Sequence, residues 1–308
     1  MGFLNNLAIL PDGRIVGVGG SESGWLVCRL TIAGELDETF GDGGFAPATF
    51  PNGQAYAVAV DPGGTVTVVG RDDRRAAVAR YLPTGDLDPN FSVDGKRRVP
   101  MGETGTQFSD DVLYSVAITD GGGLVATGDI DVGTVGVVRL DFAGGLVPSF
   151  GDGGTLIRQY GGYDIATSIL AEAGRIVVGA YADNALTVLA FDGEGTPDAS
   201  FGGGDGIASI PPGTGTMLGP GLAAHPDGGY VVAGEYAEHA DDFDLVAARL
   251  DPAGALVPGF GDGGVATAHL PQDDFTEDVA VRPDGTILLG GTREGSAGSK
   301  MLAAQLQG

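Results

Sequence analysis

The sequence predicts an all-β protein, a six-bladed β-propeller whose blades are four-stranded antiparallel sheets. Two observations predict this fold. First, the stretch GELDETFGDGG at residues 34–44 returns at 144–154 and 254–264, with looser copies at 85–95 and 195–206. Second, the intervening residues form short apolar runs rich in β-branched residues, separated by turns and without helical periodicity. A repeat of 51 to 59 residues fits a propeller blade, because β-solenoid coils and WD repeats are shorter.

The second repeat shows the four predicted strands in order. The first, Ala57–Val60, is followed by the turn Pro62-Gly63-Gly64, where proline presets φ and glycine supplies a positive φ. The second, Val66–Gly70, is apolar on both faces, so we expect it to be buried on both sides. The third ends at Ala79-Arg80-Tyr81, and the fourth is the weaker run after each Gly-Gly pair.

The connections between these strands are either fixed or variable in length. The turn glycine and the end of the second strand are six residues apart, as from Gly13 to Gly19. The strand-three position, for example Arg29, precedes the motif phenylalanine, for example Phe40, by 11 residues in all five copies. The other two connections vary. Because alternate connections of an antiparallel meander lie at the same end, the variable connections share one face, where we expect binding.

The repeats run through the whole chain, so residues 1–308 are predicted to form a single propeller domain. The chain has six strand cores but five copies of the motif, and its first and last repeats are incomplete. The ring is therefore expected to be one strand short, or to be completed by a longer chain. No apolar stretch of about 18 residues and no signal peptide is visible. The single cysteine, Cys28, is predicted to be a buried, inert thiol.

The net charge excludes some classes of partner. The chain has 41 Asp and Glu against 16 Lys and Arg, which gives a formal net charge of −25. A field of this sign repels phosphate backbones and anionic lipids, so we expect neither a nucleic-acid partner nor membrane insertion. Cations and basic partners are compatible with it.

The repeated motif has two interpretations. Its aspartates could bind calcium together with turn carbonyls, and these candidate metal ligands are Asp42, Asp152 and Asp262. In the structural interpretation, each phenylalanine fills a gap between blades and each glycine supplies a turn conformation. The residues with this structural role are Gly34, Phe40, Gly85, Phe91, Gly144, Phe150, Gly195, Phe201, Gly254 and Phe260. The structural interpretation is preferred, because the aspartate position is not filled in every copy.

An arginine recurs at one position of the third strand in four repeats. These residues are Arg29, Arg80, Arg139 and Arg249. A ring of guanidinium groups could bind an anionic ligand. In the preferred alternative, each arginine lays its stem along a neighbouring blade and pairs with an acidic turn residue.

Two acidic loops on the variable connections are candidates for ligand or partner binding. Their candidate residues are Phe108, Asp110, Asp111, Asp273, Asp274 and Phe275. They could contact a protein partner or a divalent cation. The alternative is a pair of solvated loops whose phenylalanines fold inward.

In these features the chain resembles the delta-60 repeat family, also described as the DUF5122 β-propeller family. Gln54–Gly70, Ala77–Tyr81 and Gly34–Gly44 carry the matching pattern most clearly. The chain departs from the pattern at Ser92-Val93 and at Ala190, where arginine is usual. The resemblance implies a propeller fold and an extracytoplasmic location, in bacterial surface or secreted proteins. It implies no established activity.

The function predicted from the sequence is a non-enzymatic binding or structural module of a larger bacterial surface or secreted protein. Its partner would be a protein or a glycan on the variable face, and it would act without a cofactor, as a monomer or part of a longer chain. The alternative is a calcium-dependent hydrolase or lactonase with a site in the central channel. That alternative needs acidic or amide residues on the first strands, whereas Leu7–Leu10 and Ala57–Val60 are apolar. A spacer that binds no ligand is the third hypothesis.

Overall fold

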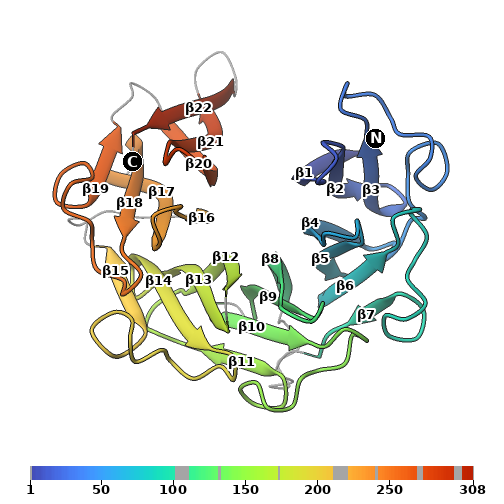
Figure 1. Cartoon of the computed structure of the whole chain (residues 1–308), viewed down its shortest axis with the longest axis horizontal. Coiled ribbons are helices and arrows are strands. Elements are labelled where there is room, and N and C mark those ends of the chain that lie inside the picture. The colour runs from blue at the N-terminus through green and yellow to red at the C-terminus, as the bar shows by residue number, and fades with distance from the viewer. Residues whose placement is uncertain are drawn as a thin grey trace. The chain divides into compact units, whose positions relative to one another are not determined.

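The computed structural model describes residues 2–100, 111–130, 133–172, 174–210, 221–239, 242–268, 273–294 and 300–307. The strands in these ranges form six antiparallel sheets of three or four strands, which follow one another along the chain (Figure 1). The predicted all-β, six-bladed propeller fold is therefore confirmed. No helix within the described ranges is long and apolar enough to cross a membrane.

The chain divides into two compact units, of which Met1–Arg158 is the first. In each of its three sheets the strands pair in chain order. The first sheet is β1 (Phe3–Ile9), β2 (Ile15–Ser21) and β3 (Gly24–Leu30); the second is β4 (Gly53–Val60), β5 (Val66–Asp72), β6 (Arg75–Tyr81) and β7 (Lys96–Arg98); the third is β8 (Val112–Ile118), β9 (Leu124–Asp129), β10 (Val135–Leu140) and β11 (Thr155–Arg158).

The second unit, Gln159–Gly308, also has three sheets whose strands pair in chain order. They are β12 (Ile165–Glu172), β13 (Arg175–Ala182), β14 (Ala185–Asp192) and β15 (Ile207–Ile210); β16 (Gly221–Ala224), β17 (Tyr230–His239), β18 (Asp242–Leu250) and β19 (Val265–Ala268); and β20 (Asp273–Val281), β21 (Ile287–Glu294) and β22 (Lys300–Leu306). That both units belong to one domain stays a prediction.

Each sheet has two ends with different connections. The turns after the first strands and the motif turns lie at one end, which we call the fixed face. The hairpins after the second strands and the segments that enter the next sheet lie at the other end, the variable face. This division follows from antiparallel pairing in chain order. Gly64 in a fixed-face turn has a φ of 84°, as its turn position predicts.

The first and sixth sheets have three strands each. In the first, the residues after the motif make two isolated bridges to β3, one between Cys28 and Phe45 and one between Trp25 and Thr49. Pro47 lies between these bridges, and proline has no backbone N–H to donate to a ladder. The corresponding run in the second repeat, β7, contains no proline and pairs with β6. One proline thus explains why the fourth strand of the first sheet is missing.

The core lies between neighbouring sheets. Between the first two sheets, Val16 and Val18 of β2 pack in one cluster with Val58 of β4 and Val68 of β5. Side chains on both faces of the second strands are buried, as predicted. The motif phenylalanines are also buried; they are Phe40, Phe91, Phe150, Phe201 and Phe260.

A β-bulge interrupts the first strand of five sheets, close to the variable face. In β4 the extra residue is Tyr56, between the paired residues Ala55 and Ala57. The bulged backbone comes so close to β5 that a Cβ on Gly70 would lie 2.1 Å from the carbonyl oxygen of Gln54. This approach explains the glycine at the end of the second strand. The extra residues are Asn5, Tyr56, Tyr114, Thr167 and Glu277.

Candidate functional site

The repeated motif ties each of several sheets to the next one. In the first repeat, Arg29 Nε donates to Asp37 Oδ2 at 2.8 Å, and Arg29 Nη1 donates to the carbonyl oxygen of Pro83 in the second sheet at 2.6 Å. The guanidinium carbon lies 4.6 Å from the ring centroid of Phe40, within range of a cation–π contact. We call this arrangement of arginine, aspartate and phenylalanine against the next sheet the clasp.

The second repeat forms the same clasp against the third sheet. Arg80 Nε donates to Asp88 Oδ2 at 2.8 Å, and Arg80 Nη1 donates to the carbonyl oxygen of Phe142 at 2.6 Å. The side chains of Arg80 and Asp88 are 4% and 5% exposed, so this ion pair is buried. The guanidinium also stacks on Phe91 and Phe142, at 4.8 and 4.2 Å from their ring centroids. Both clasps lie at the fixed face.

In the fourth repeat a different residue completes the clasp. Ala190 stands at the arginine position, and Arg175 at the start of β13 supplies the guanidinium instead. Its Nε donates to Asp198 Oδ2 at 2.7 Å, and its Nη1 donates to the carbonyl oxygen of Pro252 in the next sheet at 2.8 Å. Arg175 Nη2 donates to Ser200 at 2.9 Å. The departure at Ala190 therefore leaves the contact between these sheets intact.

The third and fifth repeats have valine at the aspartate position, at Val147 and Val257. In the fifth, Arg249 Nη2 lies 3.2 Å from both Asp227 Oδ2 and His225 Nδ1. Burial lowers the pKa of His225, which favours the neutral imidazole beside this arginine.

The remaining arginine of the predicted ring, Arg139, is half-buried, and its backbone N–H donates to the carbonyl oxygen of Gly154 at 3.0 Å. Anion binding by the four arginines stays a prediction. The contacts of Arg29, Arg80 and Arg249 with acidic side chains correspond to the structural interpretation of this position.

The three candidate calcium ligands are exposed residues of the motif turns. The backbone N–H groups of Asp42, Asp152 and Asp262 donate to the carbonyl oxygens of Phe45, Thr155 and Val265. Within the described ranges, no three His, Cys, Asp or Glu side chains lie close enough together to hold a metal ion. Calcium binding by these turns stays a prediction.

The acidic loops are only partly within the described residues. Asp111 is buried, and its backbone N–H donates to the carbonyl oxygen of Arg74 at 3.1 Å. Phe108 and Asp110 lie outside the described ranges. The backbone of Asp273–Phe275 starts strand β20, and the side chains of Asp273, Asp274 and Phe275 lie outside the description.

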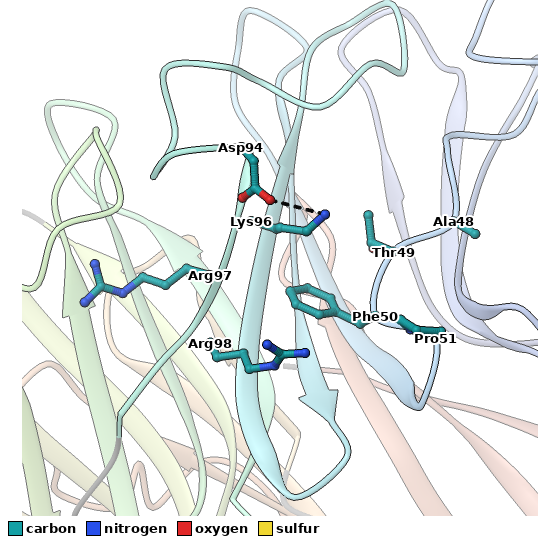
Figure 2. A pocket seen from close by; sticks show the side chains of 8 residues that line it. All are labelled: Ala48, Thr49, Phe50, Pro51, Asp94, Lys96, Arg97 and Arg98. Atoms are coloured by element: carbon teal, nitrogen blue, oxygen red, sulfur yellow. Dashed lines mark ion pairs between the residues drawn. The ribbon is translucent and has the colours of Figure 1, made fainter.

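A pocket of about 290 Å³ lies between β7 of the second sheet and residues 48–51, the segment that enters this sheet (Figure 2). Lys96 and Arg98 extend from β7 toward this segment, whereas Arg97 points to the opposite side, because successive side chains of a strand alternate. These residues form the longest basic run of the chain. The run was not among the predicted site residues, although its contrast with the net charge is visible in the sequence.

The two cations of this pocket differ in how they are held. Arg98 Nε donates at 2.6 Å to Oδ2 of Asp72, whose side chain is 2% exposed. Lys96 Nζ lies 3.3 Å from Asp94 Oδ2, and the lysine side chain is 37% exposed. A buried carboxylate therefore fixes the position of Arg98, and both cations are accessible from solvent, since the Arg98 side chain is 57% exposed.

The opposite wall of the pocket contains a strained residue. Phe50 has a φ of 49°, a conformation that bulky side chains rarely adopt. Its ring packs on Trp25 with centroids 4.7 Å apart, and its carbonyl oxygen accepts from the N–H of Gly53 at 2.9 Å. Beside it, the hydroxyl groups of Thr49 and Tyr81 are hydrogen-bonded at 2.9 Å. Strain of this kind persists where the surroundings fix it, and it clusters at functional sites.

Residues 63–91, from the first turn to the motif phenylalanine of the second repeat, match the family described as "Domain of unknown function (DUF5122) beta-propeller". This match confirms the resemblance that the repeats indicate. No curated protein matches the chain.

Two solved structures show how general the fold is. Virginiamycin B lyase from Staphylococcus aureus is 10% identical with a TM-score of 0.54, and the match covers 99% of this chain and 84% of that one. The PQQ-bound aldose sugar dehydrogenase from Streptomyces coelicolor is 15% identical with a TM-score of 0.53, and the match covers 97% and 92%. At such identities the fold alone is shared. The chain is thus a six-bladed β-propeller protein that matches the DUF5122 family over residues 63–91.

Proposed function

We propose that this chain is a non-enzymatic binding module of a bacterial surface or secreted protein, and that it binds a glycan at the variable face. The observation that carries this proposal is the pocket of Figure 2, where cationic side chains of β7 face a strained segment at Phe50. The pocket runs along β7, the edge strand of its sheet: one end, at Asp94, belongs to the motif turn at the fixed face, and the other end, at Arg98 and Pro51, points toward the variable face.

The clasps support this division of roles between the two faces. They join neighbouring sheets at the fixed face through buried groups such as Arg80 and Asp88. The sheets that the clasps join are a rigid scaffold for the loops of variable length at the other face. Loops held on a rigid scaffold are typical of binding proteins.

The first-strand bulges favour one alternative function. The extra residues Asn5, Tyr56 and Tyr114 are polar, although these strands were predicted to be mainly apolar. Asn5 Nδ2 donates to the carbonyl oxygen of Ala55 at 2.6 Å, and the rings of Tyr56 and Tyr114 meet at 5.3 Å. Amide and phenol groups of this kind would suit a hydrolase or lactonase, whose calcium would come from solution.

A glycan array probed with the whole chain tests the proposal. We expect binding to a restricted set of glycans, and no hydrolysis of lactones in EDTA or with added calcium. Binding to none of the glycans would contradict the proposed function. Calcium-dependent lactone hydrolysis that is lost in Asn5→Ala would establish the alternative.

A further inference from the structure

The polar groups of the pocket in Figure 2 suit one class of ligand. Lys96 and Arg98 present positive charge, which attracts an acid group through charge-assisted hydrogen bonds. Asp94 presents a carboxylate, which accepts hydrogen bonds and so suits hydroxyl groups. Phe50 and Pro51 add an apolar wall. Each cation also has a carboxylate partner, Asp94 for Lys96 and the buried Asp72 for Arg98, so a ligand with both an acid group and hydroxyl groups could share the cations and Asp94 at the same time.

The size of the pocket agrees with this chemistry. Its volume of about 290 Å³ is just below the range of about 300–1,000 Å³ that is usual for small-ligand sites, which suits a ligand of one ring. A single sugar ring fits such a space and brings an acid group and hydroxyl groups together on one rigid frame.

The net charge of −25 does not prevent an anion from binding here. At physiological ionic strength the Debye length is about 8 Å, so distant carboxylates are screened. Two basic side chains, Lys96 and Arg98, face the segment at residues 48–51, and their carboxylate partners are Asp94 and the buried Asp72. The buried Asp72 holds Arg98 in place, which reduces the entropy lost when a ligand binds.

We propose that this pocket binds a uronate, the acidic unit of an acidic glycan. The carboxylate of the sugar contacts Lys96 and Arg98, and its hydroxyl groups donate to Asp94. This inference rests on the proposed function and names the ligand class for it.

Calorimetric titration of the whole chain with glucuronate, glucose and inorganic sulfate tests this inference. We expect glucuronate to bind more tightly than either other probe, with an affinity that falls as sodium chloride is added. Lys96→Met removes an exposed charge and should lower the affinity about tenfold or more, the usual effect of losing a hydrogen bond to a charged group. Arg158→Gln, which removes one exposed charge from β11, is the matched control and should change the affinity less than about twofold.

Each other outcome overturns the inference in a different way. Equal binding of glucose would remove the role of the cations, and equal binding of sulfate would remove the role of the sugar. If the glycan array gives ligands but glucuronate does not bind, the uronate assignment fails while the proposed function stands. If the array gives no ligand, the proposed function fails as well. An equal loss of affinity in Lys96→Met and Arg158→Gln would show attraction by overall charge instead of a site.

Discussion

Replacing Arg80 with methionine should destabilise the first unit strongly. The change keeps much of the aliphatic stem but removes the bonds from the guanidinium to Asp88 and to the carbonyl oxygen of Phe142, and its stacking on two rings. Because both charged side chains are buried, the variant leaves the Asp88 carboxylate without its cation. Breaking a buried ion pair in this way costs about 3–5 kcal/mol. At about 2–4 °C per kcal/mol for a unit of this size, the melting temperature should fall by roughly 6–20 °C.

Thermal unfolding followed by circular dichroism measures this effect, and two further variants control it. Arg158→Gln at an exposed position should change the stability by less than about 0.5 kcal/mol. Asp88→Leu combined with Arg80→Met should cost less than the sum of the two single changes, because no buried charge is then left unpaired. The reasoning is refuted if Arg80→Met melts within about 2 °C of the unchanged chain, or if the two costs add.

Three more predictions concern the clasps and one buried acid. Hydrogen bonds from Thr39 and Arg14 hold the pKa of Asp37 well below its usual range. The stability that this carboxylate contributes is therefore present above about pH 4 and is lost as the pH falls further. In an acid titration, Asp37→Asn should lose less stability than the unchanged chain. Arg175→Ala should destabilise the second unit by about 1–3 kcal/mol, and Ala190→Arg in the same chain should restore part of the melting temperature by refilling the usual arginine position. Burial raises the pKa of Glu235 to about 8. Between about pH 4.5 and 8 the unfolded chain loses this proton while the folded chain keeps it, so the free energy of unfolding should fall as the pH rises, by at most about 1.4 kcal/mol per pH unit. Urea unfolding of Glu235→Gln should not show this fall.

The repeat made the fold predictable because sheet periodicity and turn chemistry act locally. The turn at Gly64 and the strand at Val66–Gly70 follow from residues that are adjacent in the sequence. The loss of the fourth strand in the first sheet depends on the single residue Pro47, whose effect is clear only when the bridges on either side of it are known.

The clasp could be predicted only in part. Recurrence indicated that the arginine pairs with an acidic turn residue, but the carbonyl oxygen of Phe142 belongs to the next sheet, and sequence spacing does not specify such a contact. Sequence spacing also does not predict that Arg175 takes the place of the arginine missing at position 190. Arg175 reaches the clasp only because β13 pairs with β14.

The pocket at Lys96 and Arg98 could not be predicted from the repeat, because its residues differ from one copy to another. Its wall depends on the positive φ of Phe50, which is set by packing against Trp25 and not by a turn signal in the sequence. The bulge at Tyr56 was not predicted, because Gly70 was interpreted as the residue that ends the second strand. In the structure a glycine is required there because the bulged backbone at Gln54 lies too close for a side chain.

The central claim is that the clasps hold the sheets together while the pocket beside β7 binds the ligand. Measuring the melting temperature and the glucuronate affinity of Lys96→Met and Asp198→Asn tests this claim directly. Asp198 belongs to a clasp in the second unit, and Lys96 lines the pocket in the first. We predict that Lys96→Met loses affinity at an unchanged melting temperature, and that Asp198→Asn loses thermal stability at an unchanged affinity. Loss of affinity in Asp198→Asn with full binding in Lys96→Met would contradict the claim.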